Sequence, residues 1–387
     1  MNVKPKHLLA ALCCIVMVWY IIRVLVYVDY LYSYNYRYMK LKIFGVQSYC
    51  PSEPMLHTES MQATRTSDMT WNHVVSEFVS SNHAGYAIYA PDRNAGLCNR
   101  MLNSISVLMF AMATNRSFWL NWTRVDTHAH YNEVIGQSEF SSLFQTRLLS
   151  KPPPAWANTL DLNVDECLAF KMRYGDVRQI KNDVVSLNSG DFWGSILLLN
   201  PIFKESTFKN LNMNEGFPVL FKHLFNPHVH SRPKRCSWFF QYRYNWAKEY
   251  STAPFDNFLG CATTYGFTKE HYSTSYVITD NLTALMQGAS LPTKKILTKM
   301  NFIEKKTPCR GPCGDNSTVA HMYALSSCQH AVLTASSSFG VCIAGLGNIQ
   351  NVVKVSRYGD CHRPKYLLLD PNAMAPYGSG RTLLHEI

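Results

Sequence analysis

The feature that most constrains the fold of this chain is an alternation of short apolar strands and helices. Tyr86–Tyr89 (Y-A-I-Y) has the composition of a short buried strand, and a glycine turn follows at Gly96. Apolar side chains then recur at helical spacing over 99–114, and 118–122 (F-W-L-N-W) predicts a second strand. A strand, a turn, a helix and a strand make up a βαβ unit, which predicts a parallel sheet.

The same alternation restarts in the second half of the chain. Strands are predicted at 237–243, 275–279, 331–335 and 352–355, and helices at 318–328 and 341–346. The region 123–232 between the two halves has no clear period, and we expect short helices there. Two α/β halves joined near residue 230 predict two Rossmann-like domains that face each other across a ligand cleft.

The N-terminus predicts a membrane anchor. Residues 8–28 are apolar except for Arg23, and this segment is long enough to cross a bilayer. Bulky side chains continue to Val28 where a signal peptide would have small residues, so an uncleaved anchor fits better. Residues 1–7 then form a short cytoplasmic tail, and 29–80 read as a stem. Basic residues on both sides of the anchor leave its orientation to be decided by the rest of the chain.

Cysteines and glycosylation sequons indicate a luminal body. Ten of the 12 cysteines lie beyond the anchor, which favours an oxidising compartment and disulfide bonds. For Cys309 and Cys313 in C-R-G-P-C, disulfide bonding is favoured over a metal clip, and the connectivity of the cysteines is left open. Four sequons also lie beyond the anchor. Asn115 is expected to be buried at a helix end. The candidate glycosylation sites are therefore Asn121, Asn281 and Asn316, and the predicted topology is type II.

Composition and charge narrow the class of ligand. Hydrophobic residues make up 47% of the chain, which is typical of a globular protein with a real core, and the formal net charge is +11. No stretch combines a dense run of Lys and Arg with interleaved aromatic residues, so nucleic acid is not the expected partner. A diphosphate-bearing small molecule needs only one or two well-placed cations.

Three places carry residues suited to anion binding. The turn that opens the first helix presents Asn99 and Arg100, and the serine-rich turn 336–340 (S-S-S-F-G) opens a helix in the second half. Each turn taken alone is explained as well or better by helix capping. Arg243 is the sharper candidate, because it ends an apolar strand at the edge where open α/β sheets bind ligands and because arginine pairs with phosphate in a bidentate fashion.

Taken together, these segments resemble a family. The stretch G-L-C-N-R-M-L-N-S-I-S-V-L-M-F-A-M-A-T-N-R is similar to the first signature of the plant-type xyloglucan α-1,2-fucosyltransferases. S-I-L-L-L-N-P-I-F, H-L-F-N-P, F-F-Q-Y-R and M-Y-A-L-S resemble further segments of that family in the same order. So do L-T-A-S-S-S-F-G-V-C-I-A-G-L-G and C-H-R-P-K-Y, and the resemblance spans roughly residues 85 to 370.

The resemblance implies a GT-B fold and an inverting, metal-independent transfer of fucose from GDP-fucose to a glycan hydroxyl, with α-1,2 linkage to a galactose-type residue. It implies an acceptor-side domain over 81–230 and a nucleotide-sugar-binding domain over 231–387, held in the lumen of the Golgi. No cofactor and no metal is expected, and no convincing D-x-D motif is present. The residues carried over to the donor site are Arg243, Ser337, Ser338, Phe339 and Gly340, with Asn99 and Arg100 facing the cleft from the first domain.

The chain also departs from the family pattern. Cys98 replaces the second glycine of G-L-G-N-R, and His321 stands where the family tends to have Glu. A carboxylate that deprotonates the acceptor would be Asp92, Asp256 or Asp280, and the sequence does not choose among them. Two alternatives to a fucosyltransferase therefore stay open: a GT-B transferase with another nucleotide-sugar donor, and an inactive, membrane-anchored glycan-binding homologue. The acceptor and the oligomeric state are also left open.

Overall fold

A computed structural model describes most of the chain beyond residue 69, and these residues all belong to one compact unit, 56–387. The described ranges are 70–91, 97–122, 140–163, 168, 172–173, 175–188, 192–198, 200–204, 206–209, 211–227, 235–243, 253–304, 312–335 and 337–364. The predicted tail, the anchor 8–28 and most of the stem lie outside them. Within these ranges, no helix has the length and apolar character needed to span a membrane.

The first half is built on a four-stranded parallel sheet in the order β2-β1-β5-β4. The sheet consists of β1 (Tyr86–Tyr89), β2 (Ser117–Leu120), β4 (Thr159–Asn163) and β5 (Val184–Asn188). The predicted βαβ unit is confirmed, because β1 and β2 pair in parallel and α3 (Leu97–Thr114) connects them. Parallel strands require a crossover of this kind.

Helix α3 is buried along nearly its whole length. It packs on β1 and β2 and against α6 (Gly194–Leu198) and α8 (Met213–Leu224). Ser106, in the middle of α3, accepts hydrogen bonds from the backbone N–H groups of Trp193 and Gly194 at 3.1 and 2.9 Å. A polar side chain inside this apolar helix therefore holds the start of α6.

The last ten residues of the predicted stem belong to the folded body. They form α2 (Trp71–Ser80), whose apolar side is buried against α8. The indole nitrogen of Trp71 donates a hydrogen bond to the carbonyl oxygen of Asn212 at 2.7 Å. Residues 71–80, which were assigned to the stem, thus pack on the folded body, because the buried indole of Trp71 anchors α2 beside α8.

The middle region contains strands as well as the expected short helices. The helical elements described here include α4 (Phe140–Leu143), η2 (Val177–Gln179), α6, α7 (Pro201–Lys204) and α8, and β3 (Phe144–Gln145) pairs with β6 (Asn226–Pro227). The expected short helices are present, and the strands β4 and β5, which the sequence analysis did not predict, lie here as well. β5 is short, follows Asp183 and ends on the polar residue Asn188, so its strand pattern is easily mistaken for a loop.

The second half is built on a six-stranded sheet in the order β12-β11-β10-β7-β8-β9. All neighbours pair in parallel except the edge strand β12, which is antiparallel to β11. The strands are β7 (Trp238–Tyr242), β8 (Ser275–Thr279), β9 (Asn301–Glu304), β10 (His330–Thr334), β11 (Asn351–Val355) and β12 (Cys361–His362). The predicted α/β class with parallel sheets is confirmed.

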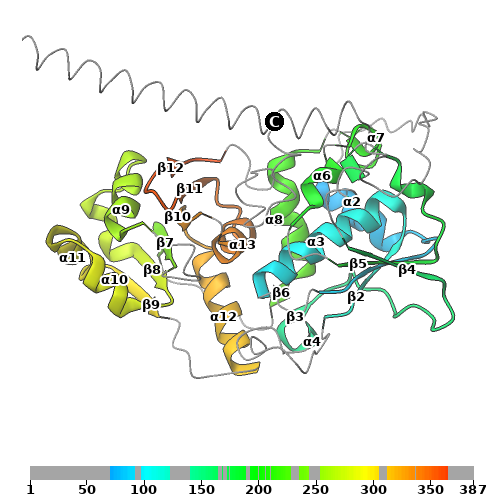
Figure 1. Ribbon diagram of the computed structural model, residues 1–387, viewed down its shortest axis with the longest axis horizontal. Helices are drawn as coiled ribbons and strands as arrows, with labels where there is room; N and C mark the ends of the chain where they lie inside the picture. Colours follow the sequence, from blue (N-terminus) through cyan, green and yellow to red (C-terminus); the bar gives the residue numbers. More distant parts are fainter. Residues whose placement is uncertain are drawn as a thin grey trace, which may run out of the picture. The chain divides into compact units, whose positions relative to one another are not determined.

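Helices cover both faces of this second sheet (Figure 1). Alternate strand residues such as Phe239 and Leu333 face α12 (Pro312–Leu325) and α13 (Ser338–Leu346) and belong to the same core as the first half. Residues such as Phe240 and Val332 form a second core on the other face. The helical elements of that half before α12 are α9 (Phe255–Thr264), η3 (Lys269–Thr274), α10 (Leu282–Gly288) and α11 (Leu291–Leu297).

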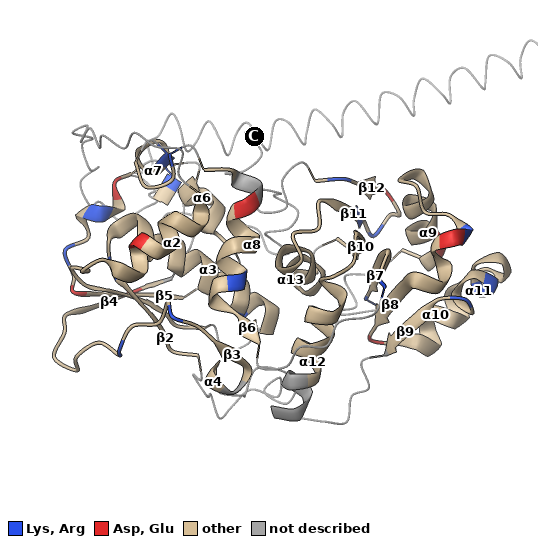
Figure 2. Cartoon of the chain, turned by 180° about the vertical axis from the view of Figure 1, so that it is seen from behind, with Lys and Arg blue, Asp and Glu red and all other residues tan. Residues whose placement is uncertain are grey.

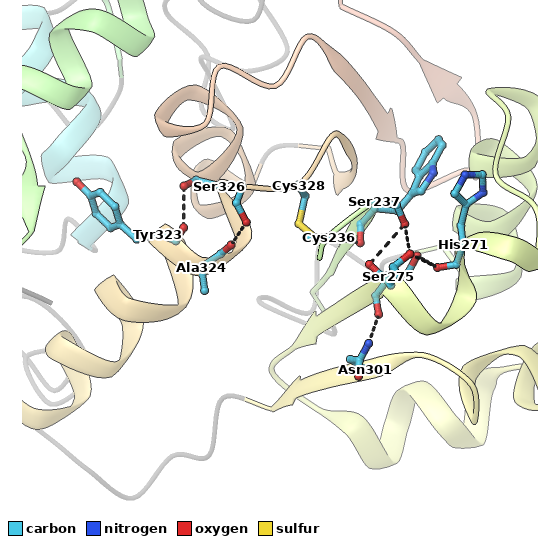
Figure 3. The surroundings of a disulfide bond; sticks show 12 residues. Cys236, Ser237, His271, Ser275, Asn301, Tyr323, Ala324, Ser326 and Cys328 are labelled. Carbon is cyan, nitrogen blue, oxygen red and sulfur yellow. Dashed lines mark hydrogen bonds between the residues drawn. A yellow bond between two sulfur atoms is a disulfide. The ribbon is translucent and has the colours of Figure 1, made fainter. Parts of the chain in front are cut away.

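Two disulfide bonds close the second half. Cys236 is bonded to Cys328, which ties the start of β7 to the segment before β10 (Figure 3). Cys261 on α9 is bonded to Cys361 on β12. Among the described cysteines, Cys98 and Cys342 are buried and unbridged. Cys309 and Cys313, for which disulfide bonding is expected, lie outside the side chains that the structure describes.

Candidate functional site

The carboxyl edge of the second sheet gathers the strongest of the predicted site residues. Tyr242 at the end of β7 is the register partner of Thr279 at the end of β8. Arg243 and Asp280 come directly after these two residues, so the sheet itself makes them neighbours. The carboxyl edge is where open α/β sheets bind their ligands.

Thr334, at the end of β10, fixes the backbone at this edge. Its hydroxyl accepts a hydrogen bond from the backbone N–H of Arg243 at 3.1 Å and donates one to the carbonyl oxygen of Gln241 at 2.9 Å. The side chain of Gln241 accepts in turn from the backbone N–H of Thr334 at 3.2 Å. Arg243 is therefore held beside the turn that leads into α13.

The guanidinium of Arg243 lies in a partly buried, electrostatically balanced position. Its Nε is 3.9 Å from Oδ2 of Asp280, and about a third of each side chain is exposed, 33% and 37%. Burial lowers the pKa of Arg243, while the Asp280 carboxylate and the nearby Cys98 act in the opposite direction. A partly desolvated guanidinium binds an anion more strongly than one in bulk water does.

The start of α13 adds neutral hydrogen-bonding groups next to Arg243. Ser337 is the residue before the helix, and its side chain makes no capping hydrogen bond. Ser337 is only 5% exposed, and its buried hydroxyl has no hydrogen-bond partner among the described residues. A serine hydroxyl can both donate and accept hydrogen bonds. Ser338 and Phe339, half-buried, begin the helix.

Gly340 is required by close packing. A Cβ at this position would lie 2.8 Å from Leu333 Cδ2 and 3.3 Å from Gln241 Oε1. The glycine thus lets the first turn of α13 lie directly on β10 and β7. Helix α13 carries no charged residue (Figure 2), so the positive end of its dipole adds to the charges of Arg243 and Asp280 at this edge.

The first turn of α3 meets the second half at the same place. The thiol of Cys98 lies 3.9 Å from the sulfur of Met322 on α12, and the thiol of Cys342 on α13 lies 3.5 Å from the carbonyl oxygen of Cys98. Asn99 follows in this turn and is half-buried. Arg100 is buried, and its Nη1 donates a hydrogen bond to the carbonyl oxygen of Trp122 at 3.0 Å, which ties α3 to the end of β2.

The three candidate carboxylates have different surroundings. Asp92 lies outside the described residues. Asp256 accepts hydrogen bonds from the backbone N–H of Ser290 at 3.2 Å and from the hydroxyl of Thr293 at 2.7 Å, and also from the Ser290 hydroxyl. It thereby joins α9 to the start of α11, which is a structural role. Asp280 faces Arg243, and of the two described carboxylates it is the one that the structure places at the candidate site.

Two residues at this site, and Tyr323 on the adjacent helix α12, escaped the sequence analysis. Thr334 and Gln241 make the hydrogen bonds that fix the backbone of Arg243. The sequence signal that could have identified Gln241 is a lone glutamine in the apolar strand F-F-Q-Y. Tyr323 on α12 has a buried hydroxyl without a described partner, and burial raises its pKa well above the ordinary value, as does the nearby Cys342. Its side chain points away from the Cys236–Cys328 disulfide (Figure 3).

The predicted glycosylation sites are placed as follows. Asn121 and Asn281 are exposed, and Asn281 also caps α10 by accepting a hydrogen bond from the backbone N–H of Ala284 at 2.9 Å. Asn316 lies within α12. The expected burial of Asn115 was wrong: it is exposed at the end of α3, in a left-handed backbone conformation with φ of 52°. A left-handed residue ends a helix and turns its side chain outward.

In the part of the chain that the structure describes, no group of three or more His, Cys, Asp or Glu side chains is arranged to hold a metal ion. Neither a protein-family model nor a curated protein sequence matches the chain.

Solved structures do resemble it. A variant of Arabidopsis thaliana FUT1 in complex with GDP is similar with a TM-score of 0.50 and 13% identity, over 79% of this chain and 77% of that one. NodZ alpha-1,6-fucosyltransferase soaked with GDP-fucose has a TM-score of 0.42 and 13% identity, over 72% and 98%. NodZ from Bradyrhizobium has a TM-score of 0.39 and 13% identity, over 71% and 95%. The chain therefore has an α/β fold with parallel sheets that is similar to the fold of Arabidopsis FUT1.

Proposed function

We propose that this protein is an inverting glycosyltransferase that moves fucose from GDP-fucose to a glycan hydroxyl, with α-1,2 linkage to a galactose-type residue. The observation that carries the proposal is the position of Arg243 at the carboxyl edge of β7, beside the uncapped start of α13. The order of the family-like segments supports it, as does the likeness in fold to FUT1, whose structure holds GDP.

The site suits the departure of a nucleoside diphosphate. In an inverting transfer, the acceptor oxygen bonds to the anomeric carbon, the bond from that carbon to the phosphate oxygen breaks, and its electron pair leaves with GDP. Negative charge therefore grows on the diphosphate. The guanidinium of Arg243, the hydroxyl of Ser337 and the N–H groups at the start of α13 are donors that can stabilise that charge.

The second candidate is a transferase with another nucleotide-sugar donor, and one observation favours keeping it. Cys98 occupies a position where the related family has glycine, and its thiol lies between α3 and α12 close to Arg243. A side chain at a close-approach turn alters the space that a donor occupies. A donor screen separates the two candidates.

The test is a screen of the purified luminal part, about residues 70–387. GDP-fucose, GDP-mannose and UDP-galactose are each assayed for slow hydrolysis and for stabilisation against heat. We expect GDP-fucose to be hydrolysed and to raise Tm. If a UDP-sugar is used instead, the donor assignment is wrong. If no nucleotide sugar stabilises or reacts, the protein is the inactive glycan-binding homologue.

The proposal includes a type II topology in the Golgi membrane, with residues 8–28 as the anchor. Support comes from the two disulfides of the second half and from the exposed sequons at Asn121 and Asn281. In a eukaryotic host, removal of N-glycans should shift the mobility of the chain, and Asn121→Gln with Asn281→Gln should reduce that shift. A full-length chain without glycans and with reduced cysteines would contradict a luminal body.

A further inference from the structure

Asp280 is placed next to Arg243 by the sheet rather than by side-chain flexibility. The two residues follow the register pair Tyr242 and Thr279 on adjacent parallel strands. Beyond Asp280, the backbone N–H of Asn281 donates to the hydroxyl of Thr279 at 3.2 Å, and Asn281 then caps α10. The Asp280 backbone is thus held on both sides, and its carboxylate stays near the guanidinium.

The contact between the two side chains is an ion pair without a hydrogen bond. The separation of 3.9 Å between Nε and Oδ2 exceeds hydrogen-bond range, and both groups are partly exposed to water. Ion pairs of this kind are weak and exchange readily. The carboxylate is therefore close enough to balance the charge of Arg243, and it is not locked to it.

We propose that Asp280 is the resident counter-ion of Arg243, which the diphosphate of GDP or of the donor displaces on binding. This inference rests on the proposed function. In the empty protein, the carboxylate stabilises a guanidinium that burial would otherwise penalise. When a diphosphate arrives, two anions compete for one cation, and the negative charge of Asp280 also repels the phosphates. Asp280 therefore weakens GDP binding and speeds release of the product.

This role predicts the direction of change in variants. Asp280→Asn preserves size and removes the charge, so GDP should bind about fivefold more tightly, mainly through slower dissociation. Asp280→Glu retains the charge and should bind GDP within about twofold of the wild type. In the transfer reaction, kcat of the Asn variant should fall where GDP release limits turnover.

Two other roles for Asp280 predict different results. A residue that only orients Arg243 would, when changed to Asn, weaken GDP binding. A general base would leave GDP affinity unchanged and lose turnover by about a hundredfold or more. The direction in which Asp280→Asn changes GDP affinity therefore distinguishes the counter-ion role from the orienting role and from the general-base role.

The experiment measures GDP affinity and dissociation rate for the wild type, Asp280→Asn, Asp280→Glu and Arg243→Ala in one low-salt buffer. Asp161→Asn is the matched control, because Asp161 is an exposed aspartate on β4 of the other half. Tm of each variant without ligand checks folding. We expect Asp280→Asn alone to bind more tightly than the wild type.

Unchanged or weaker GDP binding by Asp280→Asn overturns the counter-ion role, even where Arg243→Ala abolishes binding and so supports the donor site. Equal tightening by Asp161→Asn also overturns it, because the effect would then be one of net charge. A wild-type protein that does not bind GDP, or an Arg243→Ala variant that binds GDP as well as the wild type, overturns the donor-site assignment and this inference with it.

Discussion

The thiol of Cys342 on α13 lies 3.5 Å from the backbone carbonyl oxygen of Cys98 at the start of α3. This contact joins the two α/β halves at the edge where Arg243 lies. The thiol of Cys98 in turn contacts the sulfur of Met322 at 3.9 Å. Cys98 therefore packs against both α12 and α13, through its thiol and its backbone carbonyl respectively.

Both thiols should resist modification in the folded protein. Burial raises the pKa of Cys342, and so does the adjacent thiol of Cys98, so the reactive thiolate is scarce. We expect iodoacetamide to label neither residue under native conditions and to label both in denaturant. Peptide mapping by mass spectrometry measures this. Rapid native labelling of Cys342, or a disulfide between the two, would contradict the structure.

Asp256 should matter for stability and not for turnover. Burial favours its neutral form, but hydrogen bonds from Ser290 and Thr293 outweigh this and lower its pKa. Its stabilising effect is therefore present above the unfolded pKa of about 3.9 and is lost as the pH falls through the lower folded pKa. Asp256→Ala should cost about 1 kcal/mol in urea unfolding at pH 7.

The same aspartate tests the assignment of the base. Because Asp256 joins α9 to α11, Asp256→Asn should keep the transfer rate within about twofold of the wild type at a temperature where the variant is folded. A hundredfold loss of rate with normal GDP affinity would instead make Asp256 the base.

His330 should make the protein less stable in mild acid. Its ring stacks on Trp238, with centroids 4.2 Å apart and planes at 10°. Burial lowers the pKa of His330, and the charges of His271 and Arg363 add to this. The unfolded chain therefore binds more protons, so stability is full above about pH 6.5 and declines as the pH falls below it.

The matched variant is His330→Phe, which keeps an aromatic ring on Trp238 and cannot be protonated. Its Tm should fall less than that of the wild type between pH 7.5 and pH 5.5. His73→Gln, on the exposed side of α2, should follow the wild-type profile. Equal pH dependence in the wild type and His330→Phe would show that this stack is not the sensitive element.

The strands and helices that carry the site could be predicted because their apolar patterns are strong. The segment A-V-L-T-A before 336–340 and the strand ending at Arg243 are hydrophobic enough to indicate that both are buried strands. Asp280 was named from the sequence, but as a base or turn residue. Its role beside Arg243 depends on which strands are neighbours, and a single sequence does not give the order β10-β7-β8.

The first half of the fold was harder to predict from the sequence, because hydrogen bonds between residues far apart in the sequence stabilise it. Arg116 is buried and donates hydrogen bonds to the carbonyl oxygens of Asn182 and Asp183 at 2.7 and 3.4 Å, which ties the start of β2 to that of β5. Trp71 fixes α2 in a similar way. A buried arginine or indole looks in the sequence like an exposed one, so both β5 and the start of the folded body were missed.

The most direct test of the donor site is calorimetric titration of GDP into the wild type, Arg243→Ala, Ser337→Ala and Arg363→Ala. Arg363 is the control, because it is an exposed arginine that donates to the side chain of Asn351, at the opposite edge of the same sheet. We predict a loss of about a hundredfold for Arg243→Ala and of about fivefold for Ser337→Ala, with no change for Arg363→Ala. GDP affinity that is the same in Arg243→Ala as in the wild type would contradict the donor site at the carboxyl edge of β7.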